Sequence, residues 1–134
     1  MKVGILAGNF DIIHPGYVRL FKDAKNACDY LVIALQTDSS IERPEKLSPI
    51  LSVEERKEVL FAIRFIDEIL TYTTEEDLYI LIETKKPDIR IIGTDYVDRD
   101  FTGKFLTPEI YYHERDHDWS TTRFKREIAR SLDR

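Results

Sequence analysis

Apolar residues along the chain alternate between short continuous runs and helical spacing. The continuous runs predict five buried strands, at 2–7, 30–35, 66–70, 89–92 and 109–112. Between them, apolar residues recur every three or four positions, which predicts four helices, at 14–28, 53–64, 74–85 and from Ser120 onward. Strands that alternate with helices are typical of an α/β fold with a parallel sheet and helices on both faces.

We therefore expect a Rossmann-like, doubly wound parallel sheet of five strands. The 134 residues lie below the roughly 150 at which chains tend to divide, so residues 1–134 are expected to form one domain. In such sheets ligands bind beyond the carboxyl ends of the strands, close to the point where the strand order reverses.

Two helices carry more detailed predictions. Ser52 and Glu55 have the spacing of a capping box, so a helix should begin there and bury four apolar residues, Val53, Val59, Leu60 and Ile63. In the last helix, residues at every fourth position should form the stripe that faces the body, namely Phe124, Ile128 and Leu132.

Composition and charge narrow the class of protein. With 43% hydrophobic and 34% charged residues the chain is globular in composition, and no apolar stretch approaches the roughly 18 residues of a membrane span, so a cytoplasmic protein without membrane contact is expected. One cysteine excludes an intramolecular disulfide and a CxxC zinc site. The net charge of −5 argues against general nucleic-acid binding. Neither GxGxxG nor a P-loop is present, which disfavours dehydrogenases and Walker-type NTPases.

Residues with chemical potential follow the predicted strands. Residues 8–14 follow the first strand, Lys46 lies in the loop after the second, 93–95 follow the fourth and 115–122 follow the last. Because the carboxyl ends of parallel strands meet at one edge of the sheet, these segments should lie together and form a binding site.

The first segment, GNFDIIHPGY (8–17), places His14, Pro15 and Gly16 at the start of a helix. Free amides and the helix dipole favour an anion there, and Gly16 would let a phosphate approach the backbone. A simple turn is the alternative.

The second segment, WSTTR (119–123), places three hydroxyl residues at the start of the last helix. They can donate to phosphate oxygens, and helix capping alone is the alternative. His113 and His117 are interpreted as exposed loop histidines. Acidic residues of the 94–107 loop are interpreted as solvated, with magnesium binding as the alternative; these are Asp95, Asp98 and Asp100.

Taken together, these segments resemble the cytidylyltransferase-like nucleotidyltransferases. GNFDIIHPGY resembles that family's GTFDxxHxGH signature, and WSTTR resembles its ISTT signature followed by a basic residue. The helix start at 52–56 and the segments 67–68 and 93–96 follow the family's order, so the resemblance covers essentially the whole chain. Within the family, the chain resembles glycerol-3-phosphate cytidylyltransferases in length.

The resemblance implies the HxGH nucleotidyltransferase fold, a homodimer, and a reaction that joins a nucleoside triphosphate to a phosphorylated small molecule and releases pyrophosphate. CTP is favoured as the nucleotide, and Mg²⁺ or another divalent cation is the implied cofactor. Metal ligands in the chain are left open.

Matching positions to the family's motifs also implies roles. The catalytic group would be His14, Tyr17, Lys46 and Arg115. The nucleotide would contact Gly8, Asn9, Phe10, Gly16, Asp95, Ser120, Thr121 and Thr122. Asp11 and Arg56 match positions on the acceptor side.

Two departures from the family pattern keep alternatives open. Tyr17 replaces the second signature histidine and carries no positive charge at neutral pH, so a nucleotide-binding homologue without catalysis remains an alternative. The stretch 72–77 lacks a lysine expected of a glycerol-phosphate enzyme and resembles heptose-phosphate adenylyltransferases, which makes adenylyl transfer the other alternative.

Overall fold

The computed structural model describes residues 1–133, in which strands and helices alternate as predicted. The elements are β1 (Val3–Gly8), α1 (Pro15–Asn26), β2 (Tyr30–Gln36), α2 (Val53–Phe61), β3 (Glu68–Tyr72), α3 (Glu75–Lys85), β4 (Ile89–Gly93), the 3-10 helix η1 (Thr94–Tyr96), β5 (Glu109–His113) and α4 (Thr121–Leu132).

The five strands form one parallel sheet in the order β3-β2-β1-β4-β5. From β1 the chain moves outward through β2 to β3, then crosses back so that β4 lies on the other side of β1. The strand order therefore reverses between β1 and β4. This arrangement confirms the doubly wound fold and places the expected binding edge at the carboxyl ends of these two strands.

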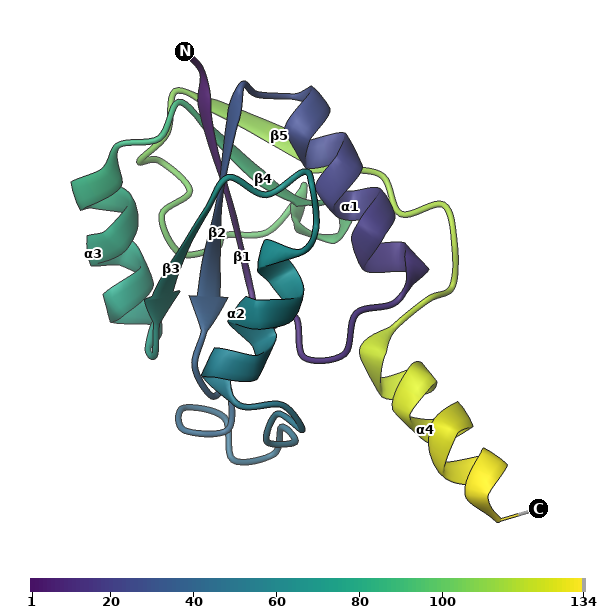
Figure 1. Ribbon diagram of the computed structural model, residues 1–134. Helices are drawn as coiled ribbons and strands as arrows, with labels where there is room; N and C mark the ends of the chain where they lie inside the picture. The colour runs from purple at the N-terminus through teal and green to yellow at the C-terminus, as the bar shows by residue number, and fades with distance from the viewer. Residues whose placement is uncertain (134) are drawn as a thin grey trace.

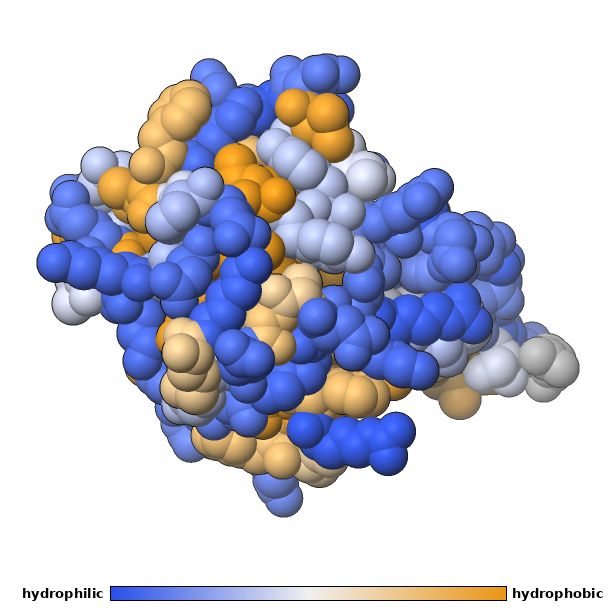
Figure 2. All heavy atoms as spheres, turned by 90° about the horizontal axis from the view of Figure 1, so that it is seen from above, coloured by the Kyte–Doolittle hydropathy of each residue, from blue (hydrophilic) through white to orange (hydrophobic). Residues whose placement is uncertain are grey.

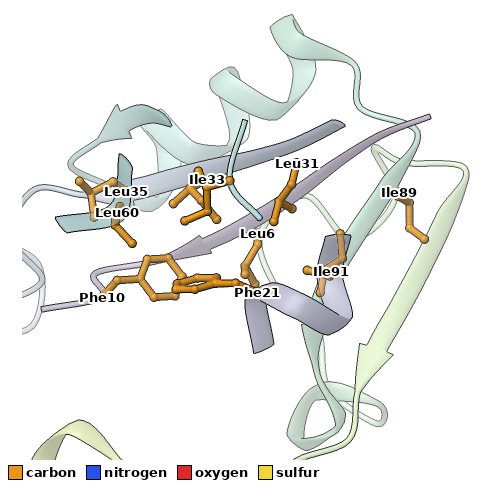
Figure 3. Packing of buried hydrophobic residues seen from close by; sticks show 11 residues of the cluster. Leu6, Phe10, Phe21, Leu31, Ile33, Leu35, Leu60, Ile89 and Ile91 are labelled. Carbon is orange, nitrogen blue, oxygen red and sulfur yellow. The ribbon is translucent and has the colours of Figure 1, made fainter. Parts of the chain in front are cut away.

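Helices cover both faces of the sheet (Figure 1). On one face, Phe21 of α1 and Leu60 of α2 pack with Leu6 of β1, as Figure 3 shows. On the other face, Ile82 of α3 packs with Ile5 of β1. Successive residues of the inner strands are thus buried on opposite sides, which explains their continuous apolar runs.

The capping box that opens α2 is present. The amide of Glu55 donates to Ser52 Oγ at 3.1 Å, and the amide of Ser52 donates to Glu55 Oε1 at 2.9 Å. Thr74 and Asp77 repeat the arrangement at the start of α3. Both helices therefore begin where polar side chains satisfy the free amides of the first turn.

The inner face of α2 differs from the prediction. The helix ends at Phe61 rather than near 64, and Val59 is 39% exposed, although Leu60 is fully buried as expected. Its other fully buried residue is Arg56, one turn before Leu60 on the same face. An apolar pattern does not predict a buried arginine, because its burial depends on polar partners elsewhere in the chain.

The position of α4 is also different from the prediction. This helix projects away from the sheet (Figure 1), and Ile128 and Leu132 are 44% and 81% exposed instead of facing the body. The prediction is right for Phe124, whose ring packs edge-on against His14 and Trp119. Amphipathic spacing defines an apolar face but does not say what that face contacts. Near its start, α4 is fastened to the body by Lys125, whose ammonium lies 2.7 Å from the Asp11 carboxylate.

Hydrophilic residues cover most of the surface seen in Figure 2, with smaller hydrophobic patches between them. Among residues 1–133, no helix combines the length and the hydrophobicity needed to cross a membrane.

Candidate active site

A cavity of about 500 Å³ opens at the carboxyl ends of β1 and β4. It brings together the two segments singled out in the sequence, and most of the predicted site residues line it: Gly8, Asn9, Phe10, His14, Gly16, Tyr17, Lys46, Asp95, Arg115, Ser120, Thr121 and Thr122. Asp11 and Arg56 lie outside this lining. We call this space the first cavity.

His14 is held in the first cavity by aromatic stacking. It precedes the first turn of α1, is 5% exposed, and lies between the rings of Tyr17 and Trp119, with centroids 4.2 and 5.7 Å away. Neither ring nitrogen has a hydrogen-bond partner in the described chain. Burial lowers the pKa of His14, and the nearby His117 and Arg115 lower it further. The imidazole is therefore neutral at neutral pH, with one nitrogen free to donate and the other to accept.

Tyr17 links the two segments directly. Its hydroxyl lies 2.7 Å from Thr121 Oγ1 across a sequence separation of 104 residues. Burial raises the pKa of Tyr17 above its ordinary value, so the phenol keeps its proton at neutral pH. When the phenol donates to Thr121, the proton of the threonine hydroxyl remains available for another acceptor.

Phe10 supports the cavity from below rather than forming an open wall. It is only 3% exposed, and its ring packs edge-on against Tyr17 and Phe21 at 5.3 Å each. Its φ of 45° is the left-handed conformation, which costs roughly 1–2 kcal/mol for a residue with a Cβ. A Cβ on Gly8 would lie 2.8 Å from this ring, so the Phe10 ring occupies the space that glycine leaves.

Gly16 serves a close contact between protein segments. A Cβ at this position would lie 2.6 Å from His117 Cε1 and 2.9 Å from Trp119 Cβ. The glycine thus lets the segment before α4 pack against the start of α1. This packing is by itself a reason for a glycine here, and the phosphate approach expected from the sequence stays a prediction.

The three hydroxyls at the start of α4 have different surroundings. Ser120 Oγ accepts from the amide of Arg123 at 3.1 Å and caps the helix. Thr121 contacts Tyr17, whereas Thr122 is exposed and lines the cavity. Ser120 Oγ is thus engaged in capping, Thr121 Oγ1 is engaged with Tyr17, and Thr122 is the hydroxyl residue of the three that is exposed in the cavity.

Two cationic side chains complete the lining. Lys46 comes from the exposed loop after β2, and Arg115 follows β5 and donates to the carbonyl of Trp119. An anion in the cavity would thus meet positive charge from two separate loops, together with the amides at the start of α4.

The cytidylyltransferase-like family model matches residues 5–128, which includes every element that builds the cavity. The chain belongs to the cytidylyltransferase-like family. This membership confirms the resemblance drawn from the two segments.

Relatives in this family include proteins with different names. The bifunctional protein HldE of Gluconacetobacter diazotrophicus is 40% identical over 99 residues, which cover 72% of this chain and 20% of that protein. The FAD synthase of Ferroglobus placidus is 36% identical over 110 residues, which cover 82% of this chain and 68% of that protein. The chain thus spans about a fifth of the length of HldE.

Solved structures show the same fold. The lipopolysaccharide core biosynthesis protein of Thermoplasma volcanium is similar with a TM-score of 0.68 and 25% identity, over 90% of this chain and 99% of that one. The pantoate-beta-alanine ligase of Francisella tularensis has a TM-score of 0.65 at 15% identity, over 98% of this chain and 69% of that one, and supports the fold alone.

Asp11, expected on the acceptor side, is instead fully surrounded by the chain. Its carboxylate accepts from the amides of Ile50 and Leu51 at 2.7 and 2.9 Å and pairs with Lys125. Burial alone would raise the pKa of Asp11, but the contacts with Lys125 and the two amides lower it below its ordinary value. The side chain joins the loop after β2 to α4.

Arg56, also expected on the acceptor side, is 1% exposed and holds strand ends together. Its guanidinium donates to the carbonyls of Asn9, Gln36 and Thr37, and its Nε donates to that of Leu51. These bonds fix the carboxyl ends of β1 and β2 relative to each other. The geometry assigns Arg56 a positioning role beneath the cavity rather than contact with a ligand.

The sequence interpretation was wrong for two histidines. His117 is half-buried and lines the first cavity, and its Nδ1 accepts from the amide of Trp119 at 3.0 Å. His113 is buried at the end of β5, with Nδ1 2.7 Å from Asp23 Oδ2. Trp119 was noted only as part of a motif, although its ring stacks on His14. The sequence signal that could have identified His117 and Trp119 is their position just before three hydroxyl residues.

Proposed function

We propose that the protein is a nucleotidyltransferase, which joins a nucleoside triphosphate to a phosphorylated small molecule and releases pyrophosphate. The observation that carries this proposal is the meeting of both family signatures in one cavity, through the Tyr17–Thr121 contact and the stacking of Trp119 on His14. Family membership supports the reaction class, and the relatives include a protein named FAD synthase.

In this reaction an oxygen of the acceptor's phosphate attacks the α-phosphorus of the triphosphate. A new phosphorus–oxygen bond forms, the bond from the α-phosphorus to the bridging oxygen breaks, and pyrophosphate leaves with that electron pair. Both reactants are anionic, so the protein's main contribution is to position them and to stabilise the charge that develops on the phosphates.

The residues of the first cavity suit that task. Neutral His14 donates one hydrogen bond to a phosphate oxygen without needing a proton from solvent, while Lys46 and Arg115 neutralise charge from two sides. Thr121, oriented by Tyr17, and Thr122 donate at the start of α4, where the helix dipole also favours an anion.

Divalent cation chemistry fits this site when the triphosphate carries the ion. Residues 1–133 contain no group of three or more His, Cys, Asp or Glu side chains placed to hold a metal. Mg²⁺ commonly binds through substrate phosphates and water, and such an ion would neutralise phosphate charge. Asp95 lines the cavity, and we propose that its carboxylate lies nearest to the bound ion.

CTP is the proposed nucleotide, on the resemblance of the two signatures to cytidylyltransferases. ATP is the second candidate, because several relatives are HldE proteins and the stretch 72–77 resembles heptose-phosphate adenylyltransferases.

A homodimer is proposed for the assembly. The apolar stripe of α4 that leaves Ile128 and Leu132 exposed is a surface that a second copy would cover.

Pyrophosphate release tests the reaction. CTP, ATP, GTP and UTP are each combined with glycerol 3-phosphate, sugar phosphates and phosphocholine in the presence of Mg²⁺, and we expect the highest rate with CTP and one phosphorylated acceptor. Faster pyrophosphate release with ATP than with CTP would identify ATP as the substrate instead. No release from any pair, together with measurable nucleotide binding, would instead identify a nucleotide-binding homologue without catalysis.

A further inference from the structure

A second cavity of about 450 Å³ lies beside the first, on the face of the sheet that α3 covers. The two cavities share a wall at the carboxyl ends of β1 and β4, made of Ala7, Gly8, Asn9, Lys46, Ile92 and Tyr96. Asn9 and Lys46 of this wall line both cavities, so ligands in the two cavities would lie on either side of the same residues. The volume is in the range of small-molecule sites.

Arg90 of β4 is a deeply buried cation that lines the second cavity. It is 4% exposed, the central carbon of its planar guanidinium lies 5.2 Å from the centroid of the Phe101 ring, and one terminal nitrogen donates to the carbonyl of Thr102 at 2.7 Å. Its Nε is buried and has no partner in the described chain. Arg90 precedes Ile92 of the shared wall by two residues on the same face of β4, so the two residues are spaced about 6–7 Å apart along the strand and Arg90 lies further from the strand's carboxyl end.

Ser39 is a second polar group of this kind. It is 6% exposed, lines the second cavity, and its hydroxyl has no hydrogen-bond partner in the described residues. Buried polar groups without partners are rare, because each costs about 1–3 kcal/mol. Two of them in one cavity indicate that a ligand supplies the missing partners.

Carboxylates and hydroxyls line the same space. Glu75 accepts from the hydroxyl of Thr102 at 2.6 Å, and Glu42 and Asp100 also face the cavity. Burial raises the pKa of Tyr72, whose phenol is therefore a neutral donor. The cavity thus offers hydrogen-bond donors and acceptors together, because the positive charges of Arg43, Lys46 and Arg90 line it beside the carboxylates.

This mixture matches hydroxyl groups, each of which both donates and accepts. A ligand end that is wholly anionic would meet the carboxylates of Glu42 and Glu75, and an apolar end would leave Arg90 and Ser39 unpaired. We infer that the second cavity binds the hydroxyl-bearing part of a phosphorylated polyol or sugar, with Arg90 as a specificity-determining residue. The inference rests on the proposed function, in which the ligand's phosphate lies at Lys46 and faces the nucleotide.

Calorimetry with sugar phosphates tests this assignment without requiring turnover. The probes are glycerol 3-phosphate, ribose 5-phosphate and mannose 1-phosphate, with phosphocholine as the phosphate that lacks hydroxyls. Arg90→Met removes the donors at similar length, and Ser39→Ala removes a hydroxyl that makes no bond within the described chain. Arg64→Met is the matched control, since Arg64 also lies over a phenylalanine ring, 5.1 Å from that of Phe65, but is exposed and outside both cavities.

We expect the wild-type protein to bind at least one sugar phosphate more tightly than phosphocholine. Arg90→Met should weaken that binding about tenfold or more, and Ser39→Ala about two- to tenfold. Arg64→Met should bind the sugar phosphate like the wild-type protein, and the nucleotide Kd should be unchanged in all three variants. Melting temperatures show whether each variant is folded. If Arg90→Met is not folded, the binding measured for Ser39→Ala decides the outcome.

Equal or tighter binding of phosphocholine, or no binding of any sugar phosphate, overturns the assignment. So does unchanged sugar-phosphate binding in folded Arg90→Met or Ser39→Ala. Pyrophosphate release is recorded separately. Tight, Arg90-dependent binding of a sugar phosphate without turnover would contradict the transferase but support the polyol site. Turnover with phosphocholine alone would support the transferase but contradict the polyol site.

Discussion

The hydroxyl of Tyr17 lies 2.7 Å from the hydroxyl of Thr121, and this contact joins the start of α1 to the start of α4. Tyr17 thus occupies the position of a signature histidine but is directed at another side chain of the site. In the reaction proposed above, the tyrosine would act on the phosphates through Thr121, as a positioning residue.

A double-mutant cycle tests this role. Tyr17→Phe and Thr121→Val should each weaken nucleotide binding about two- to tenfold, as expected for the loss of one neutral hydrogen bond of about 0.5–1.5 kcal/mol. The double variant should bind little more weakly than Thr121→Val, because Tyr17→Phe removes only a contact that Thr121→Val already lacks. Calorimetric Kd values for the four proteins provide the measurement, and additive losses would show that the two hydroxyls act independently.

Tyr17→His should slow turnover as well. An imidazole would lose the phenol's contact with Thr121 and its packing on Phe10 at 5.3 Å. The measurement is the steady-state kcat of Tyr17→His and Tyr17→Phe compared with that of the wild-type protein, and both variants should be slower. A faster Tyr17→His variant would mean that the site still functions as a two-histidine site.

His14 should make stability depend on pH in a defined window. Its pKa in the folded protein lies below the unfolded value of 6.5, so the unfolded chain binds a proton more readily. The contribution of His14 to the free energy of unfolding should be complete above pH 6.5. It should fall as the pH decreases from there toward the pKa of His14 in the folded protein. Urea unfolding between pH 7.5 and 5.5 measures this, with His14→Asn as the comparison. The variant should lose part of the slope, and an identical slope would show that His14 is protonated equally in both states.

Turnover should depend on the imidazole of His14 far more than folding does. His14→Ala should lower kcat by about a hundredfold or more, consistent with loss of a donor to developing phosphate charge. Lys46→Ala should also lower kcat if Lys46 stabilises the transition state, while a change in KM alone would indicate uniform binding. Circular dichroism of each variant serves as the folding control.

Arg56 should be needed for folding stability. Arg56→Met would leave several buried carbonyls without donors, at roughly 1–3 kcal/mol for each group that water does not reach, so a loss of about 3 kcal/mol or more is expected from urea unfolding. The exposed Arg64→Met should change stability by less than about 0.5 kcal/mol. A stable Arg56→Met protein with a raised acceptor KM would restore the acceptor role implied by the family resemblance.

The apolar stripe of α4 should determine assembly. Sedimentation equilibrium should find a dimer for the wild-type protein and a folded monomer for Ile128→Glu, because a charge at a covered apolar contact is costly. Glu127→Gln, on the same helix turn, is the control and should remain dimeric. A wild-type monomer would contradict the homodimer.

The sequence was sufficient for the sheet and for most of the lining of the first cavity. Apolar runs in the inner strands reflect burial on both faces, and residues after parallel strands must meet at one edge, so His14 and Thr121 were expected together. The roles of Asp11 and Arg56 were not predictable in this way. Both are polar residues near the site, and only the fold shows that backbone amides and carbonyls from distant loops surround them.

Two further features depend on contacts that no local pattern specifies. The second cavity requires Arg90, which interrupts an otherwise apolar strand and gives no sign in the sequence of which face it occupies. For α4, the four-residue spacing of Ile128 and Leu132 correctly predicts an apolar face, but not its direction away from the sheet.

The glycines of the first signature have a consequence for the annotation of genomes. Gly8 is required by the ring of Phe10, and Gly16 by His117 and Trp119, so both answer to packing within the protein. A descendant that has lost its chemistry but kept these rings would still need both glycines. Matches at these two positions therefore trace shared architecture, and under the proposed function positions 14, 46, 115 and 121 are the ones expected to distinguish active from inactive relatives.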